Sequence, residues 1–238
     1  MKSLARIGWF AWLGTALVVW FYPVSTRPGR LFLAASPPVL LITGSILLWR
    51  RKRLRLVPLV LLAILFCFVL APGRETNRRR LRDRYVASLK SYEGVRYVWG
   101  GENRLGMDCS GLVRVGLIRA SLSEAIATLN PRLARTALGL WWHDCTAKAL
   151  KDEYHDRTRR LFVSPSVNRT DAADIQKGDM AVTVDGMHVL VYLGDAEWVE
   201  ADPGIGKVIR ARVPVIGNAW FDQRVHLVRW RELNDPAR

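Results

Sequence analysis

The amino-terminal third of the chain is dominated by apolar sequence, and this limits the structures that it can form. Nearly unbroken apolar runs cover residues 7–24, 31–49 and 56–71. A helix that crosses a bilayer needs about 20 apolar residues, with about 17 as a minimum, so the first two runs are long enough and the third is marginal. Aromatic residues that favour the membrane interface lie near the ends of these runs, at Trp20, Tyr22 and Trp49. We therefore predict a membrane anchor of three transmembrane helices within residues 1–72.

Two other structures are compatible with apolar runs of this kind. A buried core helix can be equally apolar, and Met1–Arg6 resembles the basic start of a cleaved signal peptide. However, short basic loops separate the three runs, which argues against a soluble core. A signal peptide is also not followed by two further apolar segments of this length. The membrane anchor is therefore the preferred interpretation.

The positive charge of the chain is concentrated beside these runs. Residues 1–84 contain 15 Lys and Arg against 2 Asp and Glu, whereas residues 85–238 contain 21 against 19. The basic clusters at 50–55 and 78–82 suit contact with anionic lipid head groups. A basic chain can also bind nucleic acid, but clusters beside apolar runs favour lipid, and we predict no nucleic-acid partner. The change in charge predicts a basic juxtamembrane linker, or the start of a helix, at 73–84 and a separate domain at 85–238.

A glycine-rich stretch leads to the first candidate catalytic residue. It reads YVWGGENRLGMDCSGLV from Tyr97 to Val113, and the apolar residues that follow Cys109 have helical spacing. The glycines allow tight backbone turns. At the N-terminus of the predicted helix, unpaired N–H groups and the helix dipole favour the thiolate of Cys109, which is its nucleophilic form. A free cysteine is more often a small buried apolar residue, so this feature alone does not identify a nucleophile.

A second stretch supplies a candidate base. Two apolar runs flank a polar turn at Asp185–Gly186, which predicts a β-hairpin with His188 at the start of its second strand. The next run, Trp198–Asp202, is expected to pair with that strand and to bring Glu200 beside His188. Asp202, on the same face of the run, is the alternative partner. Cysteine, histidine and an orienting polar group are the components of an activated nucleophile.

Together, the two stretches resemble the NlpC-type family of papain-like cysteine peptidases, which hydrolyse bacterial cell-wall peptides. The family pattern combines a tyrosine, a glycine-rich turn, Asp-Cys-Ser-Gly-Leu-Val, Gly-Asp and His-Val-x-x-Tyr-x-Gly. The matching residues are Tyr97, Gly100, Gly101, Asp108 to Val113, Gly178, Asp179, His188, Val189, Tyr192 and Gly194. The resemblance covers residues 85–235, which leaves the apolar segments outside it.

The resemblance implies roles for individual residues. Cys109 would be the nucleophile and His188 the general base. Glu200 occupies the third catalytic position of the family, twelve residues after the histidine, where His, Asn, Gln or Asp is usual. Three further residues are expected near the nucleophile, in local capping or in substrate or oxyanion contacts: Tyr97, Asp108 and Ser110. The resemblance implies neither a metal nor an organic cofactor.

The substrate implied by the resemblance is a peptidoglycan stem peptide, most often cut at the γ-D-glutamyl to diamino-acid bond. The chain is expected to be a multi-pass membrane protein. Its Lys and Arg residues are nearly balanced between the two possible orientations, so the positive-inside rule does not decide between them. The implied substrate lies outside the cytoplasm, and we therefore expect the catalytic domain to lie there. Three other functions stay open: an amidase or acyltransferase that uses the same cysteine, a catalytically silent membrane-tethered binding module, and an interaction protein whose spans carry the function. Intact Cys109 and His188 favour an enzyme. The sequence makes no prediction of oligomeric state.

The remaining segments complete the expected domain. Residues 121–161 are predicted to be mostly helical, with a break at Pro131 and a second helix over about 132–150. Adjacent residues on a helix point in different directions, so His143, Asp144 and Cys145 are expected to have structural or surface roles rather than to bind a metal. Alternating residues within 207–230 predict two more strands. The expected fold class is α+β, with helices packed on an antiparallel sheet of five or six strands.

Overall fold

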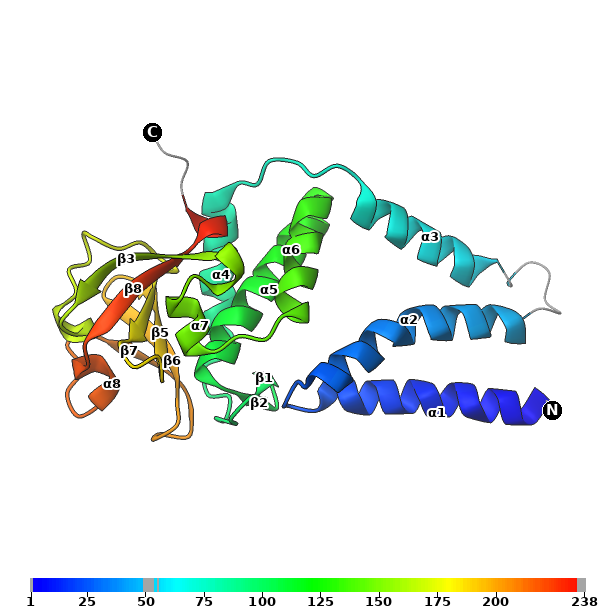
Figure 1. Ribbon diagram of the computed structural model, residues 1–238, viewed down its shortest axis with the longest axis horizontal. Coiled ribbons are helices and arrows are strands. Elements are labelled where there is room, and N and C mark those ends of the chain that lie inside the picture. Colours follow the sequence, from blue (N-terminus) through cyan, green and yellow to red (C-terminus); the bar gives the residue numbers. More distant parts are fainter. Residues whose placement is uncertain (1, 49–53, 55, 235–238) are drawn as a thin grey trace.

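The computed structural model describes residues 2–48, 54 and 56–234. Three helices precede the domain that carries the candidate site, namely α1 (Lys2–Phe21), α2 (Arg27–Leu47) and α3 (Val57–Leu70). In Figure 1, α1 and α2 form an antiparallel hairpin whose turn faces the domain. Two indole N–H groups of α1 join the hairpin, because Trp9 donates to the Leu40 carbonyl at 3.0 Å and Trp12 donates to the Ser36 hydroxyl at 3.1 Å.

The three helices correspond to the three predicted membrane segments, but they differ in length. Within the described residues, Leu4–Phe21 and Arg27–Leu47 are long and apolar enough to cross a membrane. The third helix, α3, has 14 residues. At a rise of 1.5 Å per residue it is about 21 Å long, shorter than the hydrocarbon core of about 30 Å. Trp49, the predicted end of the second span, and the basic cluster at 50–55 apart from Leu54 lie outside the described residues.

Helix α4 (Arg78–Lys90) begins inside the segment that was predicted as a linker or the start of a helix. Its N-cap is Asn77, whose side chain accepts a hydrogen bond from the Arg80 N–H at 3.0 Å. One face of the helix is buried in the domain and carries Leu81, Tyr85, Val86 and Leu89. The helical alternative is therefore correct from Arg78 onward, and this basic stretch packs into the domain.

Three helices follow the glycine-rich stretch: α5 (Cys109–Thr128), α6 (Pro131–Trp142) and α7 (Ala147–Lys151). The break at Pro131 is confirmed, with Asn130 as N-cap and proline in the first turn of α6. The predicted second helix over 132–150 is wrong at 143–146, where the chain leaves α6 before helix resumes in α7. At the end of α6 the buried guanidinium of Arg114 donates hydrogen bonds to the carbonyl oxygens of Leu140 at 2.8 Å and His143 at 2.6 Å. These carbonyls therefore have partners without a further turn of helix.

A six-stranded antiparallel sheet packs against these helices, in the order β3-β8-β4-β5-β6-β7 (Figure 1). The strands are β3 (Thr158–Ser164), β4 (Met180–Thr183), β5 (Val189–Gly194), β6 (Glu197–Asp202), β7 (Lys207–Arg212) and β8 (Val225–Trp230). The short pieces are β1 (Glu102–Asn103), β2 (Gly106–Met107), α8 (Ala219–Asp222), η1 (Tyr154–Asp156), η2 (Val167–Arg169) and η3 (Arg231–Leu233). The predicted α+β class is confirmed, and β4–β5 is the predicted hairpin. Strand β3 was missed, because the charged residues of this edge strand obscure its alternation.

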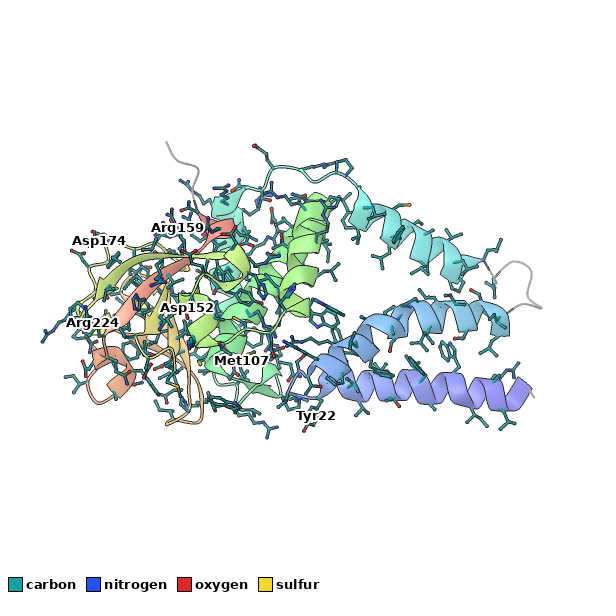
Figure 2. All side chains as sticks on the ribbon, in the orientation of Figure 1. Tyr22, Met107, Asp152, Arg159, Asp174 and Arg224 are labelled. Atoms are coloured by element: carbon teal, nitrogen blue, oxygen red, sulfur yellow. The ribbon has the colours of Figure 1, made fainter. Side chains whose placement is uncertain are left out.

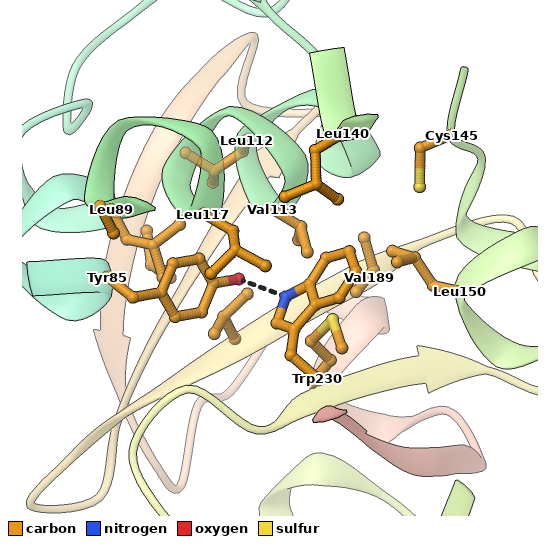
Figure 3. Close-up of a cluster of buried hydrophobic side chains, with 14 of the residues drawn as sticks. Tyr85, Leu89, Leu112, Val113, Leu117, Leu140, Cys145, Leu150, Val189 and Trp230 are labelled. Atoms are coloured by element: carbon orange, nitrogen blue, oxygen red, sulfur yellow. Dashed lines mark hydrogen bonds between the residues drawn. The ribbon is translucent and has the colours of Figure 1, made fainter. Parts of the chain in front are cut away.

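The core lies between the sheet and helices α4 and α5. In Figure 3, Val113 and Leu117 of α5 face Val189 of β5 and Trp230 of β8, and Leu112 belongs to the same buried cluster. The buried indole of Trp230 donates a hydrogen bond to the Tyr85 hydroxyl at 3.2 Å. A buried Tyr–Trp pair keeps both polar groups bonded within an apolar cluster. This packing holds the start of α5 in a fixed position relative to β5 and β6.

Candidate active site

A tight loop presents Cys109 at the first position of α5. Gly100 has φ +72, and a Cβ at Gly101 would lie 2.6 Å from the Gly106 carbonyl carbon, so glycine is required at both positions. Asp108 is the N-cap of α5 and accepts hydrogen bonds from the Gly111 N–H and, at 2.8 Å, from the Gly100 N–H. Its carboxylate therefore fastens the glycine-rich loop to the helix. The expected capping role of Asp108 is the one that the structure gives it.

Cys109 is buried, and its thiol is less acidic than the sequence pattern suggested. Burial is the main cause that raises the pKa of Cys109 to about 12, and the neighbouring Asp108 carboxylate adds to the effect. The N–H groups of Val189 and Ser110 act in the opposite direction but are outweighed. The N–H groups at the start of α5 thus act in the predicted direction, but burial has the larger effect on the pKa. A nearby base has to take the proton before the sulfur can act as a nucleophile.

His188 is the candidate base, and the residue that precedes it lies beside this thiol. The Cys109 sulfur lies 4.0 Å from the carbonyl oxygen of Met187, the residue before His188. The imidazole is buried and stacks on Trp220, with ring centres 4.2 Å apart and planes inclined by 22°. Its Nε2 lies 2.5 Å from an oxygen of Glu200. Because Nε2 is engaged with Glu200, Nδ1 is the nitrogen that can exchange a proton with Cys109.

Glu200 is fully buried in β6, and both of its oxygens are bonded. Oε2 contacts His188, and Oε1 accepts a hydrogen bond from the Asn218 amide at 2.8 Å. The predicted contact between residues 188 and 200 is therefore present. Asp202, the alternative partner, accepts bonds from Asn218 at 2.9 Å and from two backbone N–H groups in the following turn. Within the described residues it has no hydrogen bond to the imidazole.

Asn218 was missed by the sequence analysis. It is the N-cap of α8, and its side-chain oxygen accepts from the Trp220 N–H at 3.0 Å while its amide nitrogen reaches both carboxylates. The same residue thus fixes the rotamer of Glu200 and holds the helix whose Trp220 covers His188. An asparagine before a short helix could have been identified as a cap, but no local pattern links it to Glu200.

Tyr97 and Ser110, the other two residues expected near the nucleophile, have different surroundings. Tyr97 is half-buried, and its hydroxyl has a raised pKa, first because of burial and then because of the nearby Cys109, Asp108 and Asp202. This agrees with a position beside the nucleophile. Ser110 is buried, and its hydroxyl lies 3.1 Å from the Cys145 carbonyl and from Asp108. Because these contacts direct the hydroxyl into the fold, the structure argues against Ser110 as a substrate contact.

The side chains of His143, Asp144 and Cys145, which were predicted not to bind a metal, contact different parts of the fold. His143 packs against His155 with ring centres 4.4 Å apart, Asp144 pairs with Arg30 at 3.2 Å, and Cys145 is buried. Among the described residues, no group of three or more His, Cys, Asp or Glu side chains is arranged to hold a metal ion.

The sequence of the chain is similar to those of known peptidoglycan enzymes. The chain is 25% identical over 162 residues to peptidoglycan endopeptidase RipB of Mycobacterium tuberculosis, an overlap of 63% of this chain and 55% of the relative. It thus spans about half the length of the curated relative that it matches. The crystal structure of RipB superposes with a TM-score of 0.42 at 21% identity, covering 71% of this chain and 72% of that one. The P60 domain of an antigen from M. avium subspecies paratuberculosis gives a TM-score of 0.40 at 20% identity, covering 65% and 97%. The sequence profile of the NlpC/P60 family matches residues 94–229, and the chain belongs to this family.

Proposed function

We propose that this protein is a membrane-anchored cysteine peptidase that hydrolyses peptide bonds in peptidoglycan stem peptides. The observation that carries the proposal is a cysteine at the start of α5 whose sulfur lies 4.0 Å from the carbonyl oxygen of Met187, directly before a buried histidine whose Nε2 lies 2.5 Å from Glu200. This is the combination of nucleophile, base and orienting acid that acyl transfer requires. The name of RipB, a peptidoglycan endopeptidase, supports the choice of substrate.

The reaction begins with proton transfer from the Cys109 thiol to His188 Nδ1 as the sulfur attacks the peptide carbonyl carbon. The resulting oxyanion is bound by backbone N–H groups at the start of α5, with the Tyr97 hydroxyl as a further donor. When the C–N bond breaks, the imidazolium gives its proton to the leaving amine, and a thioester remains on Cys109. Water, deprotonated by His188, then attacks the thioester and releases the carboxylic acid and the thiol. Glu200 holds the imidazole orientation and balances its charge throughout.

The bond that we assign is the γ-D-glutamyl to diamino-acid bond, and digestion of purified wall peptides with mass readout tests it. We expect two fragments whose masses sum to the peptide plus one water, with the new carboxylate on the D-glutamyl residue. When the same assay is run on stem peptides still attached to their sugar, release of the intact peptide would instead indicate an amidase. A product with a new amide bond would indicate an acyltransferase, and no conversion would support a silent binding module.

The anchor is part of the same proposal, with spans at 7–24, 31–49 and 56–71, a basic segment at 73–84 whose part from Arg78 begins α4 and packs into the domain, and the peptidase domain at 85–238. Contacts between the anchor and the domain support an odd number of spans. The α1–α2 turn pairs with the domain through a β-bridge between Val24 and Gly101. At the end of α3, Arg135 donates to the carbonyls of Val69 and Ala71 at 2.6 and 2.8 Å. The α1–α2 turn and the end of α3 therefore both lie on the side of the domain, and the start of α1 lies on the opposite side.

We expect the amino-terminus to lie in the cytoplasm and the domain outside. Charge alone does not decide this orientation, because Lys and Arg are nearly balanced between the two sides of the membrane. Fusions of alkaline phosphatase and of a fluorescent protein to the carboxyl terminus measure the topology. The phosphatase should be active and the fluorescent fusion dark. A bright cytoplasmic fusion with inactive phosphatase would contradict both the topology and the proposed substrate.

A further inference from the structure

The turn between α1 and α2 is attached directly to the glycine-rich loop that precedes Cys109. Beside the Val24–Gly101 bridge, the Glu102 N–H donates to the Pro23 carbonyl at 2.9 Å. The Asn103 amide donates to Phe21 O at 3.2 Å and Tyr22 O at 2.8 Å. These carbonyls lie at the end of α1, where a helix leaves its last carbonyls without partners. Figure 2 shows Tyr22 at this turn, close to the loop that contains Met107.

A buried ion-pair cluster joins α2 to the same loop. Arg30 of α2 has a side chain that is only 2% exposed, and its Nη2 lies 3.2 Å from each oxygen of Glu102. Arg114 of α5, which is fully buried, also contacts Glu102. Burial lowers the pKa of Arg114, and the nearby Arg30 charge lowers it further. The Glu102 carboxylate therefore lies between two guanidinium groups, and its replacement by a neutral residue would remove a shared acidic partner from both, although Arg30 also pairs with Asp144 at 3.2 Å.

Glu102 is connected to the nucleophile through a short run of backbone. It pairs with Met107 across the β1–β2 ladder, and the Gly101 carbonyl accepts the Asp108 N–H at 3.0 Å. Asp108 in turn caps α5 at Cys109. A Cβ at Gly111 would collide with the Gly101 carbonyl, so the loop and the first turn of the helix are in close contact. A shift of Glu102 would therefore move the backbone that orients the Cys109 sulfur and the N–H groups of the first turn.

We propose that Arg30 is a positioning residue for the active site, and that through Glu102 the α1–α2 hairpin forms part of the framework that holds the loop at 98–108. The hairpin is then more than a tether, because the peptidase geometry depends on it. The role of Arg30 in catalysis rests on the proposed function, whereas the contact between the hairpin and the loop is independent of it.

The test uses the full-length protein in detergent, in a Cys67→Ser background because Cys67 is exposed. The variants are Arg30→Ala, Arg30→Lys, Glu102→Gln and the double variant Arg30→Ala/Glu102→Gln. Arg27→Ala, one turn earlier on the exposed face of α2, is the matched control. Three quantities are measured: kcat and KM on a soluble stem peptide, the rate of iodoacetamide labelling of Cys109 by peptide mass spectrometry, and the thermal midpoint. Assays run well below the lowest midpoint, so that every variant is folded.

We expect Arg30→Ala to lower both kcat and the Cys109 labelling rate by roughly tenfold or more, since misplacement by about 1 Å can cost 10²-fold. The KM should change by less than about threefold, because substrate contacts are retained. Arg30→Lys keeps the charge without the planar fork and should be intermediate. The double variant should lose less than the two single losses combined, because both changes break the Arg30–Glu102 contact, although each also removes a second contact, with Asp144 or with Arg114. Arg27→Ala should stay within about twofold of the parent.

The proposal is overturned if Arg30→Ala leaves kcat and labelling within about twofold of the parent, or if the two changes are additive. Should Arg30→Ala not fold, Arg30→Lys and Glu102→Gln carry the same test. If the parent protein cuts no stem peptide, the peptidase proposal fails, but the labelling rates still decide whether Arg30 positions Cys109.

Discussion

Replacing Cys109 with alanine is expected to abolish hydrolysis of stem peptides while the domain stays folded. Loss of a catalytic nucleophile typically lowers kcat by on the order of 10⁴-fold or more. The fold should survive because Asp108, not the thiol, fastens the loop to α5. Mass analysis of digests measures the activity, and a thermal melt followed by circular dichroism measures the folding. Cys67→Ala, at an exposed position in α3, is the control and should leave the activity unchanged. Near-normal turnover by Cys109→Ala would falsify the assignment.

Thiol labelling distinguishes catalysis from mere accessibility of the same residue. Because burial and Asp108 raise the pKa of Cys109 to about 12, the thiol should label slowly at neutral pH unless His188 takes its proton. We therefore expect iodoacetamide to label Cys109 in the parent protein and to label it at least about tenfold more slowly in His188→Ala. Equal labelling rates in the two proteins would show that His188 does not activate the thiol.

The second large effect is expected at Glu200. Its replacement by alanine should lower kcat by on the order of 10³- to 10⁴-fold, the range found when the orienting acid of a triad is lost. The contact between Glu200 and His188 Nε2 at 2.5 Å is the physical reason, since it fixes the tautomer in which Nδ1 accepts the Cys109 proton. Asp202→Ala should be milder, because Asp202 bonds to Asn218 and to its own turn. The reverse ranking would move the orienting role to Asp202.

A glutamine at the same position gives a finer test. Glu200→Gln should keep more activity than alanine, because its amide oxygen can still accept the Nε2–H of His188. Its amide nitrogen, however, would then face the Asn218 amide, which donates to Glu200 at 2.8 Å in the parent. Two donors in contact are unfavourable, so adding Asn218→Ser should recover part of the lost kcat while the serine still caps α8. If the second change has no effect or lowers kcat further, Asn218 does not constrain the residue at 200.

The local elements around the nucleophile could be predicted because their signals are short-range. Asp108 before an apolar run is a helix cap, and the glycines before it allow the tight loop that the structure contains. The polar turn at Asp185–Gly186 joins two apolar runs, which predicts the β4–β5 hairpin. Strand β3 and the end of α6 escaped prediction for the opposite reason. Edge position and the buried Arg114 override the local preferences there.

The contact between His188 and Glu200 could be predicted from the sequence only in part. The ladder pairs Val191 with Val199, and its extension would bring Asp202 opposite His188. The choice of Glu200 instead depends on Asn218, which bonds to both carboxylates from beyond β7. Spacing along the chain therefore narrowed the partner to two acidic residues on one strand face, and a side chain from another element selected between them.

By itself, the sequence determined the apolar helices, the helix that begins at Cys109, the hairpin that carries His188 and the family to which the chain belongs. These features depend on periodicity, caps and turns within a few residues of one another. Only the tertiary structure decided the pKa of Cys109 and the partners of Arg30, which meets Glu102 across 72 positions of sequence. Burial and ion pairing depend on which distant groups share one place in the fold, and no local pattern records that.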